Sequence, residues 1–393
     1  MKNALGVLSL VALLASSAAL AGDLNPPLGV ISPTMKDLQT VEPRTPISNA
    51  TTPGDADSTF SITAPGSYYL TGNVVGASAK NGIKIAATGV TLDLNGFSLI
   101  GVPGSLDGVR VAIAVYGITI RNGVIRDWGS DGIDALTGSN VPIIVESVHA
   151  RQNAVNGIGA GAASIIRQCL ATNNTGDGIV AGHSSIVSSC QCTSNSGDGI
   201  SSGPNATITH CTSVSSLEHG FNVNDNCTLT ACTASSNQFN GIAATVGCTI
   251  MDCTTNSNAL HGISASLGAN VQRCTSFRNT QDGIRATTGA FIAHNNCYEN
   301  GSGVASGAGV HTTGGDNRID SNNVIGNDRG IDVDGAGSLI IRNSASANST
   351  NYEFAANNRY GEVFNGLPAV TPAVSGSAAV STLSTDPWAN IAY

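Results

Sequence analysis

Residues 157–177 read GIGAGAASIIRQCLATNNTGD, and residues 178–198 read GIVAGHSSIVSSCQCTSNSGD. Both segments begin with Gly-Ile, and each carries a cysteine as its thirteenth residue and an asparagine as its eighteenth. The period of 21 residues continues without interruption to Gly283. A fixed period of this length is typical of a solenoid, in which each repeat is one coil that stacks on the next.

The glycine that opens each repeat can be followed well beyond this stretch. A further step of 21 residues separates Gly309 from Gly330, and the remaining steps are 24 to 26 residues, so the extra residues predict loops. The glycines predict about 12 coils. They are Gly82, Gly108, Gly132, Gly157, Gly178, Gly199, Gly220, Gly241, Gly262, Gly283, Gly309 and Gly330.

Apolar residues repeat in step with the glycines. The residue after each glycine is apolar, as in Ile158 and Ile179, and a second apolar column lies nine residues after it, as in Ile166 and Val187. Alternation of inward and outward side chains over so short a stretch indicates a strand. Each coil is therefore expected to contain two or three short strands, and no window shows a sustained helical period.

Two further columns are expected to stack inside the solenoid. Asparagine can adopt left-handed backbone angles at a turn, and stacked amides can form a hydrogen-bonded ladder. The first column lies four residues before each glycine and comprises Asn153, Asn174, Asn195, Ser216, Asn237, Asn258, Asn279 and Asn300. The second lies twelve residues after each glycine and comprises Cys169, Cys190, Cys211, Cys232, Cys253 and Cys274.

These columns, together with GSYYLTG at residues 66–72 and VTLDLNG at residues 90–96, resemble the right-handed parallel β-helix repeat proteins of the pectate-lyase-like superfamily. The resemblance covers about residues 60–350. It implies an all-β fold, a single-stranded right-handed parallel β-helix with an N-terminal cap and an extended C-terminal tail. It does not define the activity, because the superfamily includes lyases, hydrolases, epimerases and non-catalytic proteins.

The two ends of the chain depart from the repeat. Lys2, the apolar residues 4–20 and the sequence Ala-Leu-Ala at 19–21 are typical of a cleaved secretion signal. We therefore divide the chain into a signal peptide (1–21), an N-terminal cap segment with one short amphipathic helix (22–60), the β-helix (61–362) and a C-terminal tail (363–393). The tail is expected to cover the last coils, or else to link the solenoid to a surface anchor.

The ten cysteines allow two interpretations. Cysteines in neighbouring coils are close enough in the backbone to pair, but in-register side chains point the same way and their Cβ atoms are too far apart for an unstrained disulfide. Buried thiols that act as small apolar residues are the first interpretation. Pairing of neighbours, including Cys227 with Cys248, is the second. The C-x-C at Cys190 and Cys192 lacks the second half of a zinc site.

Charge limits the classes of partner. The formal net charge is −9, and no cluster of Lys and Arg is present, which argues against a nucleic-acid partner. No segment after the signal peptide is apolar enough to span a membrane. An exported protein, extracellular, at the cell surface or periplasmic, is therefore expected, with an extracellular polysaccharide as the partner to consider.

Candidate chemistry gathers near the C-terminal end of the outer face. Arg285, His311 and Asp332 each lie two residues after their glycine and should stand side by side, and Asp334 shares a strand face with Asp332. Asp282 lies at the edge, and the loop at about residues 300–308 should border the patch. The resemblance implies Arg285, His311 and Asp332 as catalytic residues, and Asp332, Asp334 and Asp282 as ligands of Ca²⁺.

The alternative for this patch is a solvated face of alternating charge. A second patch, without histidine, comprises Lys84, Asp107, Arg110, Asp131 and Asp134. The acidic residues and histidines before several glycines, such as Asp177 and Asp198, are interpreted as tight-turn residues and not as a metal track.

Three functions follow. The first is a secreted, non-catalytic binding or surface-structural solenoid that engages extracellular glycans. The second is a Ca²⁺-assisted uronate lyase. The third is ice binding, suggested by Thr-x-Thr at residues 207–209 and 228–230 on successive coils.

Overall fold

The computed structural model describes residues 42–136, 141–301, 307–365, 374–376 and 386–392. The chain divides into one unit of residues 1–43 and a second of residues 44–393, and the second unit is described below. The expected signal peptide and the short helix of the cap segment lie outside the described residues.

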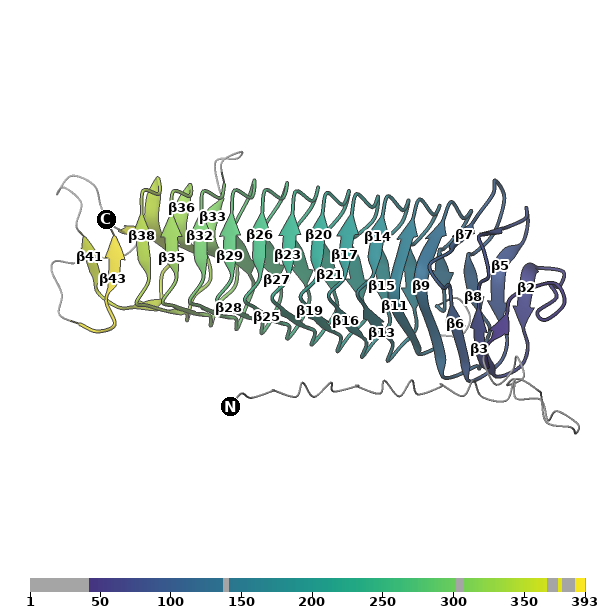
Figure 1. Ribbon diagram of the computed structural model, residues 1–393. Coiled ribbons are helices and arrows are strands. Elements are labelled where there is room, and N and C mark those ends of the chain that lie inside the picture. The colour runs from purple at the N-terminus through teal and green to yellow at the C-terminus, as the bar shows by residue number, and fades with distance from the viewer. Residues whose placement is uncertain (1–41, 137–140, 302–306, 366–373, 377–385, 393) are drawn as a thin grey trace, which may run out of the picture. The chain divides into compact units, whose positions relative to one another are not determined.

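The second unit is a solenoid of parallel strands in which each coil pairs with the next, and Figure 1 shows these coils side by side. One wall is a sheet of 15 strands. Its strands are β2 (Ser58–Ile62), β5 (Asn81–Ile85), β8 (Val109–Val111), β10 (Ile133–Asp134), β12 (Ile158–Ala160), β15 (Ile179–Ala181), β18 (Ile200–Ser202), β21 (Phe221–Val223), β24 (Ile242–Ala244), β27 (Ile263–Ala265), β30 (Ile284–Ala286), β33 (Ala308–Thr312), β36 (Arg329–Val333), β39 (Thr350–Phe354) and β42 (Val374–Gly376).

The other two walls form a second sheet of 28 strands, because β9 (Ile118–Arg126) and β11 (Ile143–Arg151) run through both. One wall adds β1 (Thr45–Pro46), β3 (Gly66–Tyr69), β6 (Val90–Asp93), β13 (Ile165–Arg167), β16 (Ile186–Ser188), β19 (Thr207–Thr209), β22 (Thr228–Thr230), β25 (Thr249–Met251), β28 (Asn270–Gln272), β31 (Phe291–Ala293), β34 (Arg318–Asp320), β37 (Leu339–Ile341) and β40 (Arg359–Tyr360). The other adds β4 (Val74–Val75), β7 (Ser98–Ile100), β14 (Leu170–Thr172), β17 (Gln191–Thr193), β20 (Thr212–Val214), β23 (Thr233–Ser235), β26 (Thr254–Asn256), β29 (Thr275–Phe277), β32 (Asn296–Tyr298), β35 (Asn323–Ile325), β38 (Ser344–Ser346), β41 (Val363–Asn365) and β43 (Asn390–Ala392).

The parallel β-helix is therefore confirmed, with three strands in each regular coil and no helix in the described residues. The expected number of about 12 coils is too small, because the first sheet has 15 strands. The three additional strands are β2, β39 and β42, which lack the Gly-Ile pair used to count repeats. At the usual strand spacing, 15 strands extend over about 70 Å.

The core is a stack of inward columns, one from each wall. Ile179, Val187 and Cys192 belong to one coil, and each has no exposed surface. Residues of the same columns in neighbouring coils are equally buried, so a single apolar core runs along the solenoid. The small number of aromatic residues is consistent with this arrangement, since each layer is filled by small and β-branched side chains.

The glycine column is required by close packing between coils. A Cβ atom on Gly178 would lie 2.6 Å from the carbonyl oxygen of Gly199 and 2.7 Å from Nδ2 of Asn195. Both distances are well inside van der Waals contact. The next coil therefore excludes any side chain at this position.

The asparagine ladder is confirmed. Oδ1 of Asn174 accepts hydrogen bonds from the backbone N–H of Asn153 (3.1 Å) and from its side-chain amide (3.0 Å). The pattern repeats along the column and is interrupted at Ser216, which has no amide. The left-handed angles expected of the asparagines belong to the preceding residues instead, such as Asn173 with φ of 55°. The asparagine is needed for its side-chain acceptor and not for its backbone conformation.

The cysteine column has the same role with sulfur as the acceptor. The backbone N–H of Cys190 points to Sγ of Cys211 at 3.5 Å. Beyond Cys274 the column continues as Asn295, whose Oδ1 accepts from the N–H of Cys274 at 2.8 Å. All ten cysteines are buried and free, which agrees with the first interpretation of the column. Burial raises the pKa of Cys192 well above that of an ordinary thiol.

The end of the chain completes the last coils. β43 pairs in parallel with both β38 and β41, so it lies between two strands that precede it in the sequence. Oδ1 of Asn390 accepts from the backbone N–H of Asn343 at 3.0 Å, which continues the second ladder by one rung. The described part of the tail thus covers the solenoid as an added strand, visible at the C-terminal end in Figure 1.

Replacing Asn258 with Ala should lower the free energy of unfolding by about 1–3 kcal/mol. The substitution leaves the buried N–H groups of Asn237 without an acceptor. Chemical denaturation compared with wild type measures the change. Ser216→Ala is the matched control, since its hydroxyl contacts only the hydroxyl of Ser213, and an equal loss in both variants would contradict the ladder.

The ten buried thiols should be unreactive in the folded protein. Titration with a thiol-specific aromatic disulfide under native conditions should give almost no release of chromophore. The same titration after denaturation without reductant should reveal all ten. A smaller value after denaturation would show that neighbouring cysteines pair.

Candidate functional site

The predicted site residues lie on neighbouring strands of the first sheet. Arg285 of β30 pairs in register with His311 of β33, and His311 pairs with Asp332 of β36. Glu353 of β39 continues this outward column. The structure therefore brings the three predicted catalytic residues side by side, with His311 between Arg285 and Asp332.

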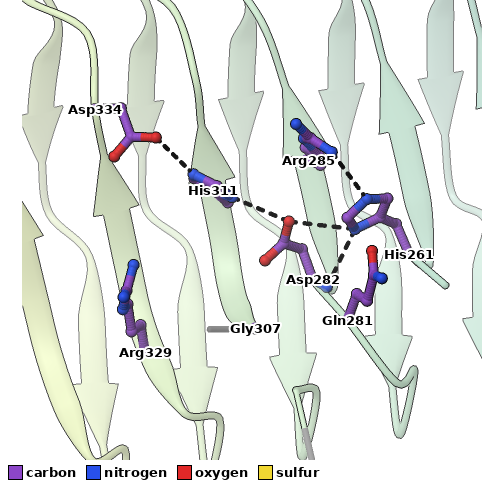
Figure 2. Close-up of a pocket in the computed structure, with 8 residues that line it drawn as sticks. All are labelled: His261, Gln281, Asp282, Arg285, Gly307, His311, Arg329 and Asp334. Carbon is purple, nitrogen blue, oxygen red and sulfur yellow. Dashed lines mark hydrogen bonds and ion pairs between the residues drawn. The ribbon is translucent and has the colours of Figure 1, made fainter. Parts of the chain in front are cut away.

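A pocket of about 360 Å³ opens beside this column. We call it the C-terminal pocket, and Figure 2 shows its lining. The lining residues are His261, Gln281, Asp282, Arg285, Gly307, His311, Arg329 and Asp334.

One wall of the pocket belongs to the column of residues before the glycines. Their side chains accept hydrogen bonds from the backbone of the following coil: Asn240 Oδ1 from His261 (3.1 Å), His261 Nδ1 from Asp282 (3.2 Å) and Asp282 Oδ1 from Ala308 (2.7 Å). The bland interpretation of this column is thus right in outcome, but its physical reason differs. These residues serve as acceptors between coils, and Asp282 does not have the positive φ of a tight turn.

His311 is the centre of the charge network. Its Nδ1 lies 3.0 Å from Asp282 Oδ2, and its Nε2 lies 3.0 Å from Asp334 Oδ2 (Figure 2). Burial would lower the pKa of His311, but the bond to Asp282 and the surrounding carboxylates outweigh it and raise the pKa to about 9. His311 is therefore a cation at neutral pH and can donate a proton, but it cannot act as a base there.

Asp282 is buried between two imidazoles. Burial alone would raise its pKa, but the contacts with His261 (3.2 Å) and His311 hold the pKa well below the usual range. Asp282 is thus a fixed negative charge at neutral pH, and it orients His311 through Nδ1.

Asp332 is also buried and is paired with Arg329. Burial raises the pKa of Asp332, and Arg329 opposes this rise. Arg329 also contacts Glu353, with Nε 3.2 Å from Oε2. Asp332 is therefore committed to an ion pair that lies beside the pocket.

Arg285 differs from the other charged residues of the site. It is exposed, and its Nη1 lies 3.2 Å from Nε2 of His261. Within the described part of the chain, Arg285 forms no ion pair with a carboxylate. Most of its donors therefore face the pocket and the solvent.

Ca²⁺ is the metal that the resemblance implies, and the donor set can be tested against it. Donor atoms of His311, Asp332 and Asp334 lie within 4.8 Å of one another, whereas Asp282 contacts the other side of the His311 ring. Ca²⁺ requires about six to eight oxygen ligands. Here a nitrogen lies beside the two carboxylates, and Arg329 already holds Asp332. The arrangement fits Ca²⁺ poorly, and we assign no chemical step to it.

Sequence reasoning omitted His261 and Gln281 from the site. His261 lies 21 residues before Asp282 in the column that precedes the glycines, so the period itself placed the two side by side. Its contribution depends on the direction of its ring, which the period does not give.

The second predicted patch is closed by its own ion pairs. Arg110 pairs with Asp107 at 3.2 Å and with Asp134, and Lys84 pairs with Asp57 at 3.1 Å. Burial, with the nearby carboxylates, raises the pKa of Asp131 to about 6. A cavity of about 720 Å³ lies beside Lys84 and Arg110, but both cations already have carboxylate partners.

The model of the family described as right handed beta helix region matches residues 107–251. Similar solved structures include the A-module of mannuronan C-5 epimerase AlgE6 from Azotobacter vinelandii, at 13% identity over 83% of this chain and 89% of that chain, with a TM-score of 0.41. PfbA, a surface adhesin of Streptococcus pneumoniae, shows 11% identity over 75% and 82%, with a TM-score of 0.38. A tailspike protein mutant of E. coli bacteriophage HK620 in complex with a hexasaccharide shows 12% identity over 84% and 70%, with a TM-score of 0.41.

No curated protein gives a significant match to the sequence. In the described residues, no helix has the length and apolarity needed to cross a bilayer. The strand pairing and the family match define the chain as a right-handed parallel β-helix protein. At the low similarity of the solved structures, any assignment of activity depends on the site itself.

His311→Gln should destabilise the protein in a manner that depends on pH. Because the pKa of His311 is raised from 6.5 to about 9 in the fold, its stabilisation is complete below pH 6.5 and is lost as the pH rises through 9. The loss in the variant should be largest at low pH within this window, at most about 3 kcal/mol. Denaturation of both proteins from pH 6 to 10 measures it, and a difference independent of pH would contradict the assignment.

Proposed function

We propose that the chain is an exported solenoid that binds an acidic extracellular glycan in the C-terminal pocket without altering it. The observation that supports this proposal is Arg285, an exposed guanidinium that borders a pocket and has no carboxylate partner among the described residues. A guanidinium matches the two oxygens of a carboxylate with parallel hydrogen bonds. A uronate group is therefore the ligand feature that this residue suits best.

The remaining lining suits the hydroxyl groups of a sugar. Gln281 and Asp334 offer acceptors at opposite sides of the pocket, and His261 offers a ring nitrogen. A pocket that combines several placed polar groups defines orientation and specificity. No aromatic residue lines this pocket, so stacking on a sugar face is missing and a modest affinity is expected.

The internal pairing of the charges favours binding over catalysis. His311 lies between two carboxylates, and Asp332 is held by Arg329. A general base needs a pKa near the working pH. The raised pKa of His311 and the lowered pKa of Asp282 do not meet this requirement.

A uronate lyase is the second candidate, because Arg285 and the protonated His311 border the same pocket. In that case Arg285 would take the proton next to the carboxylate, and His311 would donate one to the leaving oxygen. The originally expected Ca²⁺ would have to be held by Asp332 and Asp334, which the donor set does not favour.

Ice binding has less support. The threonine columns lie on the outer faces of β19, β22 and β25, but Met251 replaces the third Thr of one column, and Asn270 follows Thr249 in the other. An array of only two complete rungs is small, and threonine is common in strands.

Arg285→Ala should weaken binding of an oligogalacturonate at least tenfold, because a charge-assisted hydrogen bond contributes about 1.5–3 kcal/mol. Isothermal titration calorimetry on the mature protein measures the change. Arg273→Ala is the matched control, since Arg273 is an exposed arginine that pairs with Asp252 away from the pocket. Equal affinity in wild type and Arg285→Ala would exclude this pocket as the site.

The same samples separate binding from catalysis. Ultraviolet absorbance reports the unsaturated uronide that β-elimination produces, and it should stay flat with pectic, alginate and glycosaminoglycan substrates, with or without Ca²⁺. A rise that Arg285→Ala abolishes would favour the lyase over the non-catalytic function.

A further inference from the structure

A second recess lies on the other sheet, where the tail meets the last coils. Its floor is the outward column of the wall that contains β31, β34, β37 and β40. Phe291 pairs in register with Arg318, Arg318 with Leu339, and Leu339 with Arg359. Aromatic, cationic and apolar side chains therefore alternate over four successive coils, which does not occur in the threonine-rich middle of the same wall.

The docked tail supplies the side of this recess. The backbone N–H of Arg342 donates to the carbonyl oxygen of Trp388 at 3.2 Å. A Cβ atom on Gly361 would lie 2.0 Å from the same oxygen, so the tail can approach only because this position is glycine. The position of Trp388 is thus set by the backbone, and its ring is free of the core.

Trp388 is about half exposed, at 49%, although it is one of only two tryptophans in the chain. The guanidinium of Arg342 lies 4.9 Å from its ring centroid, within the range of a cation–π contact. The other tryptophan, Trp128, is buried and donates its indole N–H to the carbonyl oxygen of Leu99 at 3.2 Å. An indole left at the surface in this position has no role in the core.

The recess has a volume of about 420 Å³. We call it the tail groove, and its lining residues are Arg318, Leu339, Ile341, Arg359, Tyr360, Gly361 and Trp388. Arg318 and Arg342 both pair with Asp320, whereas Arg359 is exposed and forms no ion pair in the described part of the chain. The groove thus combines aromatic and aliphatic surface with a cation that lacks a counter-charge.

We propose that the tail groove is a second binding site and that it takes a sugar ring that carries a carboxylate. The ring's apolar face would stack against Trp388 above the aliphatic floor, and its carboxylate would pair with Arg359. Both halves of the argument are needed: the aromatic side chain accounts for the ring, and charge complementarity accounts for the acid. The site shares its ligand class with the proposed function but none of its residues, because the C-terminal pocket lies on the first sheet.

The tail groove would supply the stacking surface that the C-terminal pocket lacks. It exists only where the tail has docked, since Trp388 is the residue that closes it. The tail is then a cover for the last coil and, at the same time, part of a binding site.

The test uses the two tryptophans, one buried and one exposed. Titration of the mature protein with an oligomer of galacturonic acid should change the fluorescence of Trp388 and saturate, while the buried Trp128 contributes a constant background. Arg359→Ala should weaken this response about tenfold, because it removes the charge pair and leaves the fold intact. Arg278→Ala, an exposed arginine that pairs with Glu299, is the matched control and should behave as wild type.

Three results would overturn the proposal. They are the absence of a fluorescence response at millimolar oligomer, an unchanged response in Arg359→Ala, and an equal response to a neutral oligomer of glucose. Protection of Trp388 from iodide quenching without ligand would also overturn it, since the groove would then be filled by the chain itself. Arg285→Ala should leave the fluorescence response unchanged, so failure of the proposed function and failure of the tail groove are distinguishable.

Discussion

The hydrogen bonds between successive coils, in one parallel register, govern the rest of this structure. Strand pairing supplies most of them, and buried side chains supply further acceptors where the strands end. Asn174, Cys211 and Asp282 stand in three different columns, yet each accepts the backbone N–H of an adjacent coil. A buried N–H without an acceptor costs about 1–3 kcal/mol, so each column retains residue types that can accept. The 21-residue period is the result in the sequence.

The same register builds the candidate site. Residues 21 to 29 positions apart in the sequence become neighbours, so His261, Asp282 and His311 form one continuous network. Asp282 has two roles there, because one oxygen completes the backbone of the next coil and the other holds His311. This double use explains how a charged residue stays buried in a regular solenoid. It also makes the charges of the pocket mutually dependent, which suits a fixed recognition surface.

The end of the solenoid is completed by a segment that is distant in sequence. β43 enters between β38 and β41, and Asn390 occupies the ladder position after Asn343. An open coil edge would expose unpaired N–H and C=O groups. Closure by the tail removes part of that edge and, in doing so, places an indole on the outer face of β37 and β40. The aromatic surface of the protein therefore lies at its end and not along its middle.

The sequence by itself determined the period, the inward columns and the asparagine ladder, because each depends on residue type at a fixed spacing. It also placed Arg285, His311 and Asp332 in one column, since register follows from period. The tertiary structure alone decided three other features. It oriented His261 toward Asp282 and Arg285, assigned Arg329 to Asp332, and inserted residues 390–392 between strands that precede them. Side-chain direction and the pairing of a non-repeating tail depend on contacts across coils of different sequence, and a periodic pattern carries no information about either.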